Sequence, residues 1–563
     1  MRSLSMKVFG LIVLAVSAVP LAMGATISGT VKGPGGAPFD GAFVEAQNTT
    51  TSISTDVLSR QDGSYTVPNL PAGTYRLTIR AVGYKAAPQS QTLQSANQHA
   101  KADFALEKGT VRWSDLSVWQ GRVLLPNGKG KDLFFGGGPT NETAFGIQGP
   151  CFACHNFQSR MSTRQLNYQG WMGMVNYMRR DAASFFLVPP IFTDQNANEA
   201  ASYLTQVFGV DSNLPASPAD LPGYQATVRK FSDEAMNIVY VVYPLADPTW
   251  LSFQMYPPTA ANGLPSNGSI WVADYGNANR VVGIDPKTGK NTTYMAPCPH
   301  PAGIHAIEVG PHGDAWFAEQ GCNRVGSVDP RTGKVTEFQD PYRPGKEWSI
   351  FGGSKHDAHP MLVDGKVYVF SSGSPASRLD PATGKFTHIA GIPSAYDVIQ
   401  GNDGNVWFTE MHKNGSIDKV DPKTLKVTKY APTVDPVTFY PHRIKMDSNG
   451  MVWVTCRASR ICRLDPKTKA IKDFTPLGPR TARDDYAIGV GPDGGIWWSM
   501  SSLDTIQRLD PNTGHIVEYP FPYPEITMRK FFRDAHGRVW WASPANATVG
   551  YFYVEGHNRH AAK

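Results

Sequence analysis

Short stretches in which apolar and polar residues alternate, separated by glycine-rich turns, occupy most of the chain. In the first hundred residues such stretches lie at 27–31, 63–67 and 74–79. Alternation with a period of two between Gly, Pro and Asn turns predicts β-strands with one buried face. We therefore expect an antiparallel β-sandwich over residues 25–108.

From residue 237 to residue 556 the alternating pattern repeats at intervals of about 40–50 residues, which is typical of propeller blades. Each repeat carries a turn glycine followed by an aromatic anchor. The pairs are Gly268 and Trp271, Gly313 and Trp316, Gly365 and Tyr368, Gly404 and Trp407, Gly450 and Trp453, Gly494 and Trp497, and Gly537 and Trp540. A second turn, Asp-Pro-x-Thr, begins at Asp285, Asp329, Asp380, Asp421, Asp465 and Asp510. Seven repeats of four short strands predict a seven-bladed β-propeller, followed by a tail at 557–563.

The last repeat lacks the Asp-Pro turn and ends near Val554. An isolated apolar strand, Ile238–Tyr243, precedes the first repeat. We expect this strand to complete the last blade and so close the ring.

Between the sandwich and the propeller, residues 109–212 favour helices. Apolar residues at helical spacing predict a helix over 196–208, and another is expected around Trp171–Met178. Residues 213–236 are expected to be a linker. The predicted fold class is mostly β and multidomain, with a β-sandwich, a small α-helical domain and a seven-bladed β-propeller.

The first 24 residues have the features of a secretory signal peptide. Arg2 and Lys7 precede an apolar run from Val8 to Leu21, and Ala22-Met23-Gly24 is a small-x-small cleavage site before Ala25. No later segment reaches about 18 consecutive apolar residues. We expect a periplasmic or secreted protein without a transmembrane segment in its mature form.

Composition adds one exclusion. The 563 residues carry a formal net charge of +6, and no run of basic residues stands out. Nucleic acid is therefore not an expected partner.

Cys151-Phe152-Ala153-Cys154-His155 carries the most specific chemistry of the chain. Cys-x-x-Cys-His is the attachment motif of a c-type haem, in which Cys151 and Cys154 bind the haem covalently and His155 ligates the iron. The alternative is half of a zinc site, but no second Cys/His pair at zinc spacing follows.

The order Arg160, Trp171, Met178 and Tyr203 along residues 109–212 resembles the haem domains of quinohaemoprotein amine dehydrogenases. The resemblance implies a small cytochrome c domain. The methionine that many cytochromes c place before a Pro-Pro pair is Val188 here, and the resemblance favours Met178 as the sixth haem ligand.

The other candidates for the sixth ligand are Met161, Met172 and Met174. Methionine ligation raises the reduction potential and suits electron transfer. An open sixth position would permit small-ligand chemistry instead.

Four cysteines remain outside the haem motif. Cys456 and Cys462 flank a short turn and are expected to pair across a hairpin, which leaves Cys298 to pair with Cys322. Disulfides are common in exported proteins. Free buried thiols are the alternative.

The segments Asp62-Gly63-Ser64-Tyr65 and Leu70-Pro71-Ala72-Gly73-Thr74-Tyr75 resemble the carboxypeptidase regulatory-like domain. That resemblance covers nearly all of residues 25–108 and implies a small β-sandwich without catalytic residues. We expect it to serve as a spacer, a docking module or a stabiliser.

The repeat register predicts a site at one mouth of the propeller. The starts of the inner strands carry His305, His359, Tyr396, His442, Tyr486 and Arg529, and the ends of the second strands carry Asp274, Glu319 and Glu410. Equivalent positions of all blades converge on the central channel. Such a polar set suits metal ligation through neutral histidines or acid–base catalysis.

Trp316-Phe317-Ala318-Glu319 and Trp407-Phe408-Thr409-Glu410 resemble the streptogramin B (virginiamycin B) lyase propeller family, with similarity over about residues 250–555. That family opens a cyclic depsipeptide ester by elimination with a His base, a nearby Glu and magnesium. His442 matches the base. Its own blade lacks the acidic partner, so that Glu319 or Glu410 would have to serve.

The sequence as a whole favours an exported oxidoreductase. A small-molecule substrate would bind at His305, His359, His442, Glu319, Glu410 and Arg529, and the haem would pass electrons to an electron-acceptor protein. A second metal ion in the propeller, copper or iron held by histidines, is a further expectation. The alternatives are a lyase that uses His442 and a divalent cation, and a non-enzymatic protein that transfers electrons or binds a partner.

Overall fold

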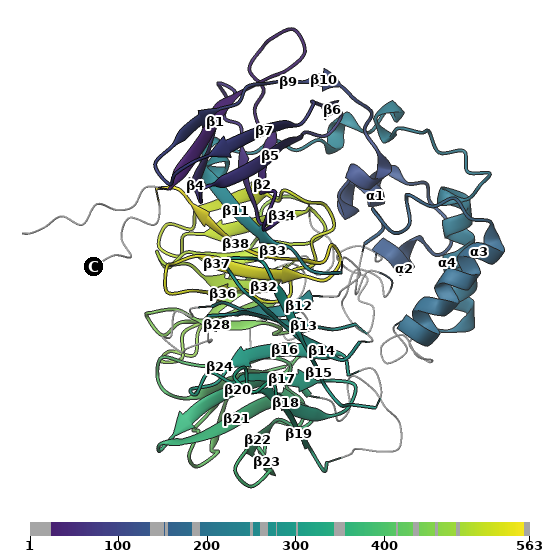
Figure 1. Ribbon diagram of the computed structural model, residues 1–563. Helices are drawn as coiled ribbons and strands as arrows, with labels where there is room; N and C mark the ends of the chain where they lie inside the picture. Colours follow the sequence, from purple (N-terminus) through teal and green to yellow (C-terminus); the bar gives the residue numbers. More distant parts are fainter. Residues whose placement is uncertain are drawn as a thin grey trace, which may run out of the picture.

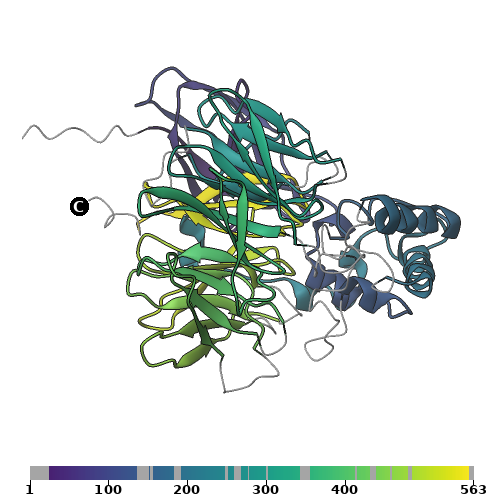
Figure 2. The ribbon, with the colours of Figure 1, turned by 90° about the horizontal axis from the view of Figure 1, so that it is seen from below.

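A computed structural model describes residues 24–135, 151, 156–182, 192–247, 252–258, 268–276, 278–299, 302–342, 355–412, 415–431, 439–456, 460–479 and 485–556. The strands of the first hundred residues lie beside the final blade of a propeller, and the helices gather at one side of it (Figure 1). The view turned by 90° shows the helices again on one side of the ring (Figure 2). The predicted signal segment, apart from Gly24, and the tail at 557–563 lie outside the described residues.

Six four-stranded antiparallel sheets follow one another in the described part of the chain from residue 252 to 520. Blades 1 and 2 consist of β12 (Ser252–Tyr256), β13 (Ile270–Asp274), β14 (Arg280–Ile284) and β15 (Asn291–Met295), then β16 (Ile304–Val309), β17 (Ala315–Glu319), β18 (Arg324–Val328) and β19 (Val335–Gln339). Blades 3 and 4 consist of β20 (Lys355–Val363), β21 (Lys366–Gly373), β22 (Ser377–Asp380) and β23 (Lys385–His388), then β24 (Val398–Gln400), β25 (Val406–Thr409), β26 (Ile417–Val420) and β27 (Val427–Tyr430). Blades 5 and 6 consist of β28 (Ile444–Met446), β29 (Val452–Cys456), β30 (Arg460–Leu464) and β31 (Ile471–Phe474), then β32 (Asp485–Val490), β33 (Ile496–Met500), β34 (Thr505–Leu509) and β35 (Ile516–Pro520).

Blade 7 joins the two ends of the propeller. Its strands are β36 (Phe532–Arg533), β37 (Val539–Ser543), β38 (Thr548–Val554) and β11 (Ile238–Tyr243). β11 pairs with β38 in antiparallel register, and β12 contacts both β16 and β37. The predicted closure of the ring by residues 238–243 is confirmed.

The second edge of β11 continues into the N-terminal sandwich. Its residues Val239–Val242 pair with β3, which makes one eight-stranded sheet in the order β36-β37-β38-β11-β3-β2-β5-β7. That sheet adds β2 (Phe43–Asn48), β3 (Ser54–Leu58), β5 (Gly73–Arg80) and β7 (Gln89–Leu93) to blade 7. The opposing sheet holds β1 (Ala25–Lys32), β4 (Ser64–Leu70), β8 (His99–Lys101) and β9 (Phe104–Ala105), and a small ribbon pairs β6 (Tyr84–Lys85) with β10 (Glu107–Lys108).

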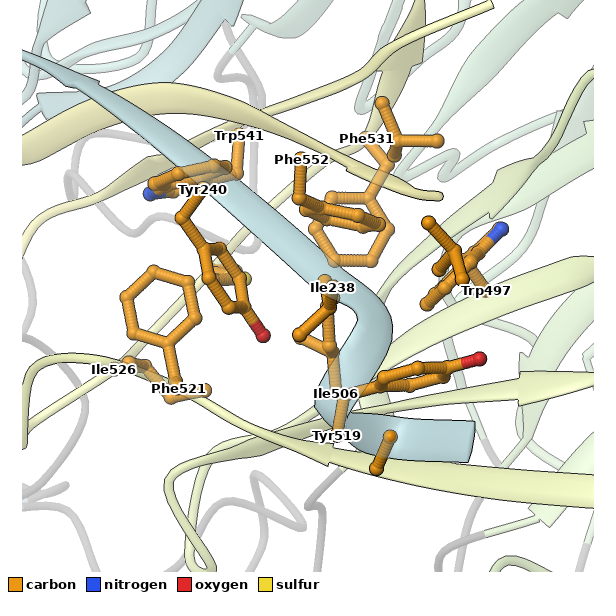
Figure 3. Packing of buried hydrophobic residues seen from close by; sticks show 14 of the residues in the cluster. Ile238, Tyr240, Trp497, Ile506, Tyr519, Phe521, Ile526, Phe531, Trp541 and Phe552 are labelled. Carbon is orange, nitrogen blue, oxygen red and sulfur yellow. The ribbon is translucent and has the colours of Figure 1, made fainter. Parts of the chain in front are cut away.

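An aromatic core holds this shared sheet against blade 6. Tyr240 points from β11 into a cluster where its ring centroid lies 5.0 Å from that of Phe521 and 6.0 Å from that of Trp541 (Figure 3). Its hydroxyl donates to the Pro520 carbonyl at 2.7 Å. The sandwich therefore covers an edge that would otherwise present unpaired backbone groups, and it acts as part of the propeller wall.

The turn signals of the sequence have structural reasons. All seven turn glycines have a positive φ, for example 86° at Gly313 and 76° at Gly404, a backbone region that glycine adopts without strain. In each of the six Asp-Pro-x-Thr turns an aspartate Oδ1 accepts the backbone N–H two residues later. These Asx turns explain why the motif recurs.

Residues 109–227 form the helical part. Its helices are α1 (Val118–Leu124), α2 (Lys131–Phe135), α3 (Tyr168–Tyr177) and α4 (Asp194–Phe208). Thr193 caps α4 by accepting from the Asn196 N–H, and the predicted apolar face of this helix is buried. Both expected helices are present, within two or three residues of the predicted bounds. No helix of the described part is both long and apolar enough to cross a membrane.

Both predicted cysteine pairs are disulfides. Cys298 pairs with Cys322, and Cys456 with Cys462. The first joins the segment after β15 to the loop between β17 and β18, and the second spans the hairpin of β29 and β30.

Candidate functional site

The inner strands of blades 2 to 7 place one polar side chain each around the channel entrance. We call these six the mouth ring; its members are His305, His356, Tyr396, His442, Tyr486 and Arg529. Ring centroids of neighbours are close, at 5.5 Å for His305 and His356, 5.3 Å for His356 and Tyr396, and 4.2 Å for His442 and Tyr486. The Arg529 guanidinium lies 4.4 Å from the centre of the Tyr486 ring. Of the six residues predicted at the starts of the inner strands, all except His359 therefore belong to the mouth ring.

The prediction for blade 3 is wrong by three residues. In the other blades the aromatic anchor pairs with the residue three positions after the ring member, as Trp316 does with Glu308. In blade 3 the buried Phe370 pairs with His359, which makes His356 the ring member. The reason is the two-residue turn between Val363 and Lys366, which lengthens the hairpin of blade 3. The aromatic anchor of this blade is therefore Phe370 and not Tyr368.

The mouth ring is hydrogen-bonded and largely shielded from solvent. Tyr396 OH lies 3.2 Å from His305 Nε2 and also bonds to Tyr486 OH. Burial, helped by the neighbouring Arg443, lowers the pKa of His305 well below its ordinary value. Burial also raises the pKa of Tyr396 well above its usual range. At neutral pH the ring thus offers a neutral imidazole and a protonated phenol.

A second tier of charged residues follows the mouth ring along the inner strands: Asp357, Asp397, Arg443 and Lys530 come one position after a ring residue, and Glu308 comes three positions after His305. Arg443 Nη1 is 2.8 Å from Asp357 Oδ2 and 3.3 Å from Asp397 Oδ1. Lys530 Nζ is 3.1 Å from Asp397 Oδ1 and 3.1 Å from Glu308 Oε1. All five side chains are nearly inaccessible to solvent. Buried ions persist when they are paired in this way.

The two aspartates of this tier titrate as a pair. Burial raises the pKa of Asp357 to about 7, although Lys530 and Arg443 act to lower it. For Asp397 burial acts in the same direction, but Lys530 and Arg443 outweigh it and hold its pKa well below the usual range. Of the two, Asp357 thus favours its protonated form and Asp397 its ionised form.

The third tier contains His359. Its Nδ1 lies 2.5 Å from Glu308 Oε2. Burial favours the neutral form of Glu308, but Lys530 and His359 outweigh it and lower its pKa to about 2. Burial and the nearby Lys530 lower the pKa of Lys445 to about 8. His359 belongs to the channel but not to its mouth.

The three predicted carboxylates do not join the mouth ring. Asp274 pairs with Arg280 at 2.5 Å, and Glu410 accepts from Ser416 Oγ and Lys429 Nζ, both at 2.7 Å. These partners lie on third and fourth strands of the same blades, so the carboxylates point away from the channel axis.

Glu319 also lies within its blade. Burial and the facing carboxyl of Glu337 raise the pKa of Glu319 to about 9. Its oxygens lie with the sulfurs of Cys298 and Cys322 in the one group of three potential ligand atoms within 4.8 Å that the described residues contain. Within the described part of the chain this group does not include a mouth-ring histidine, and the histidine-held metal at the mouth stays a prediction.

The haem motif is described only in part, because Cys154 and His155 lie outside the described residues. Cys151 is the one described cysteine outside a disulfide, and it packs against the core of the helical part. Burial raises the pKa of its thiol. An unpaired thiol in a chain whose other described cysteines are paired fits a thioether-forming residue.

Methionine side chains surround the same core. Met161, Met172 and Met174 pack against it. Met178 directly follows α3, and its backbone N–H donates to the Met174 and Val175 carbonyls. The side chain of Met178 is partly buried. The haem and Met178 as its sixth ligand stay predictions.

The residues after the motif dock on the propeller. Gln158 Nε2 donates to Asp504 Oδ2 at 3.2 Å, and the Ser159 N–H donates to Glu525 Oε1 at 2.9 Å. Asp504 follows the end of β33, and Glu525 precedes Arg529 by four residues. Both acids thus lie at the face where inner strands begin and second strands end, which is the face of the mouth ring.

The second tier of charged residues and the contacts of Gln158 and Ser159 with the propeller were not predicted from the sequence. Arg443, Lys530 and Asp397 each follow a mouth-ring residue by one position, so a charged residue at that register of a buried strand was an available signal. Nothing in the sequence pointed to Gln158 and Ser159.

Comparisons with known proteins agree with two of the resemblances. Residues 26–107 match the model of the carboxypeptidase regulatory-like domain, and residues 387–561 match that of the virginiamycin B lyase family. No curated protein sequence matches the chain.

Solved structures resemble the propeller. A streptogramin B lyase structure has 21% identity and a TM-score of 0.48, covering 57% of this chain and 100% of that chain. A catalytically inactive virginiamycin B lyase from Staphylococcus aureus with quinupristin has 17% identity and a TM-score of 0.46, covering 56% and 99%. The WD40 β-propeller domain of Doa1 has 12% identity and a TM-score of 0.38, covering 55% and 98%. The chain thus combines a segment similar to the carboxypeptidase regulatory-like domain with a propeller whose second half is similar to the virginiamycin B lyase family.

Proposed function

We propose that this protein is an exported oxidoreductase in which a small molecule binds at the mouth ring and a c-type haem on the helical part accepts its electrons. The observation that carries the proposal is the docking of residues 158 and 159 at the mouth face. The docked segment begins three residues after His155 in the sequence, and a haem bound next to this segment would be near the mouth ring. Close spacing is what electron transfer between the two sites requires.

Cys151 and Cys154 would hold the haem and His155 would ligate its iron, with Met178 as the predicted sixth ligand. When bound, the haem supplies one-electron redox chemistry and passes electrons to an acceptor protein.

The mouth ring would bind and deprotonate the substrate. His442 lies between Tyr396 and Tyr486, at 4.3 and 4.2 Å between ring centroids, and is the proposed base. Arg529 would orient a negatively polarised group of the substrate. The hydrogen bonds from Tyr486 through Tyr396 to His305 offer a route by which a proton leaves the ring.

Substrate-dependent haem reduction tests this proposal. The purified, haem-loaded protein would be mixed anaerobically with panels of alcohols, amines and aldehydes, and the haem spectrum followed. His442→Ala should lower the reduction rate by roughly 100-fold or more, as loss of a general base does. His515→Ala is the matched control. His515 is exposed, and its ion-pair partner Glu234 is not a member of the mouth ring. Equal rates in wild type and His442→Ala would contradict the proposal.

A lyase is the second candidate, favoured by the family match over residues 387–561, which contains His442 and Arg529. Elimination moves no electrons to an acceptor, so product would form without haem reduction. It would persist in His155→Ala, disappear in His442→Ala and require a divalent cation. Haem reduction that is lost in both variants would exclude the lyase.

A further inference from the structure

We propose that Cys298, Cys322 and Glu319 form a redox-exchangeable zinc site that replaces the disulfide between blades 1 and 2 when that disulfide is reduced. The inference does not depend on the haem or on the mouth ring. It concerns a buried group of side chains for which the proposed function has no use.

The three side chains already converge. Their sulfur and carboxylate oxygen atoms lie within 4.8 Å of one another, the range that one bound ion spans. The two cysteines are each 6% exposed and Glu319 is 0% exposed. Cys298 comes from the connection between two blades, whereas Cys322 and Glu319 belong to blade 2. A shared ion would therefore keep the link that the disulfide makes.

Glu319 supplies the independent observation. No amine, amide, hydroxyl or guanidinium donor among the described residues reaches its carboxyl oxygens, and the group that shares a hydrogen bond with them is a second carboxyl. Its neighbour is another carboxyl, Glu337, whose Oε1 is likewise buried without a donor while Oε2 pairs with Arg324. Buried carboxyls in native proteins usually have amide, hydroxyl or cationic donors, so a pair that shares only a proton beside two sulfurs calls for an explanation. A cation provides one.

The chemistry balances with a dithiol as reductant. Exchange with the dithiol opens the Cys298–Cys322 bond, moves two electrons and two protons to the sulfurs and leaves the reductant as a disulfide. Zinc then binds as the two thiols and the carboxyl of Glu319 release their three protons to solvent, and the resulting carboxylate of Glu319 is the third ligand. Glu337 or a water completes a tetrahedral site.

Zinc is the metal that this donor set favours. Thiolates select zinc over magnesium or calcium, and zinc accepts carboxylate oxygen as well as sulfur. The +2 charge offsets the thiolates, which a buried pocket does not otherwise tolerate.

The test uses the full, haem-loaded chain with Cys456→Ala and Cys462→Ala, so that Cys298 and Cys322 are its only reducible pair. The protein is treated with a water-soluble phosphine, passed through an anaerobic sizing column, incubated with zinc chloride and separated again. Thiols, zinc and iron are then counted per chain. We expect no retained zinc before reduction, and one zinc with two new thiols after it.

Matched carboxyl variants locate the ligand. Glu319→Gln should weaken zinc binding at least tenfold, whereas Glu410→Gln, at the equivalent position of blade 4, should leave it unchanged. Two thiols without retained zinc would overturn the proposal, as would equal affinity in Glu319→Gln. A disulfide that stays closed in the folded protein would also overturn it.

Discussion

Two sets of buried carboxyls in the same propeller behave in opposite ways. Glu308 and Asp397 in the channel are at most 6% exposed, yet nearby cations lower both pKa values: Lys530 and His359 lower that of Glu308 to about 2, and Lys530 and Arg443 lower that of Asp397. Glu319, between strands of blade 2 and equally buried, has its pKa raised to about 9 by burial and by Glu337. The identity of the neighbour, rather than burial, thus decides whether a carboxyl is charged.

This difference separates an electrostatic scaffold from a ligand site. The charges of the channel satisfy one another and hold the inner strands around the mouth ring. The carboxyls near the Cys298–Cys322 disulfide lack a donor or cation of their own, apart from the Arg324 partner of Glu337.

Removing the central cation of the channel should have the largest effect. Lys530→Met removes the cation that Glu308 and Asp397 share, and it leaves the buried carboxyls of the channel with too few positive charges. We expect a loss of about 3–5 kcal/mol in the free energy of unfolding, measured by urea denaturation at pH 7. The control is Lys423→Met, which breaks the exposed Lys423–Asp364 pair and should leave the urea midpoint nearly unchanged. Equal effects of the two variants would show that the channel network is not a scaffold.

Neutralising one carboxyl from each set should change stability in opposite directions. The pKa of Glu308 falls on folding from 4.5 to about 2, so its ionised form stabilises the fold above pH 4.5, and this contribution is lost as the pH falls toward 2. The pKa of Glu319 rises on folding from 4.5 to about 9, so ionisation opposes folding increasingly between those values.

At pH 8 we therefore expect Glu308→Gln to destabilise by about 3 kcal/mol and Glu319→Gln to stabilise by about 1 kcal/mol or more. At pH 4.5 Glu319→Gln should be within about 0.5 kcal/mol of wild type. Urea denaturation of the oxidised protein at both pH values provides the measurement. The same sign for both variants at pH 8 would contradict the comparison.

The two disulfides should differ by the smallest amount. Cys298 and Cys322 are separated by 24 residues, and Cys456 and Cys462 by 6. Loop-closure entropy predicts that replacing the first pair by alanine costs about 1 kcal/mol more than replacing the second. Thermal unfolding of both double variants without zinc tests this. A larger loss of stability in the variant Cys456→Ala with Cys462→Ala would show that loop-closure entropy does not explain the difference between the two disulfides.

The sequence predicted the architecture because repeats and turns are local signals. The turn glycines need a positive φ and the Asp-Pro turns need an aspartate acceptor, so both recur visibly. The closing strand Ile238–Tyr243 was recognisable because an apolar strand without a partner must find one. Its second partner, β3, could not be predicted, since pairing with the sandwich depends on how two domains meet.

The site was predictable only where the register was regular. His305, His442 and Arg529 were placed correctly, but the short turn of blade 3 shifted His359 out of the mouth ring. Glu319 and Glu410 share the face of the ring, yet the orientation of a side chain at a strand end depends on partners in the outer strands. Residue spacing does not carry that information.

The most direct test of the account is the covalent haem content of the exported, mature chain. We expect one iron per chain, present as haem that remains attached to the denatured polypeptide, and its loss in the variant Cys151→Ser with Cys154→Ser. A mature chain that lacks haem, or haem that survives both substitutions, would contradict the account.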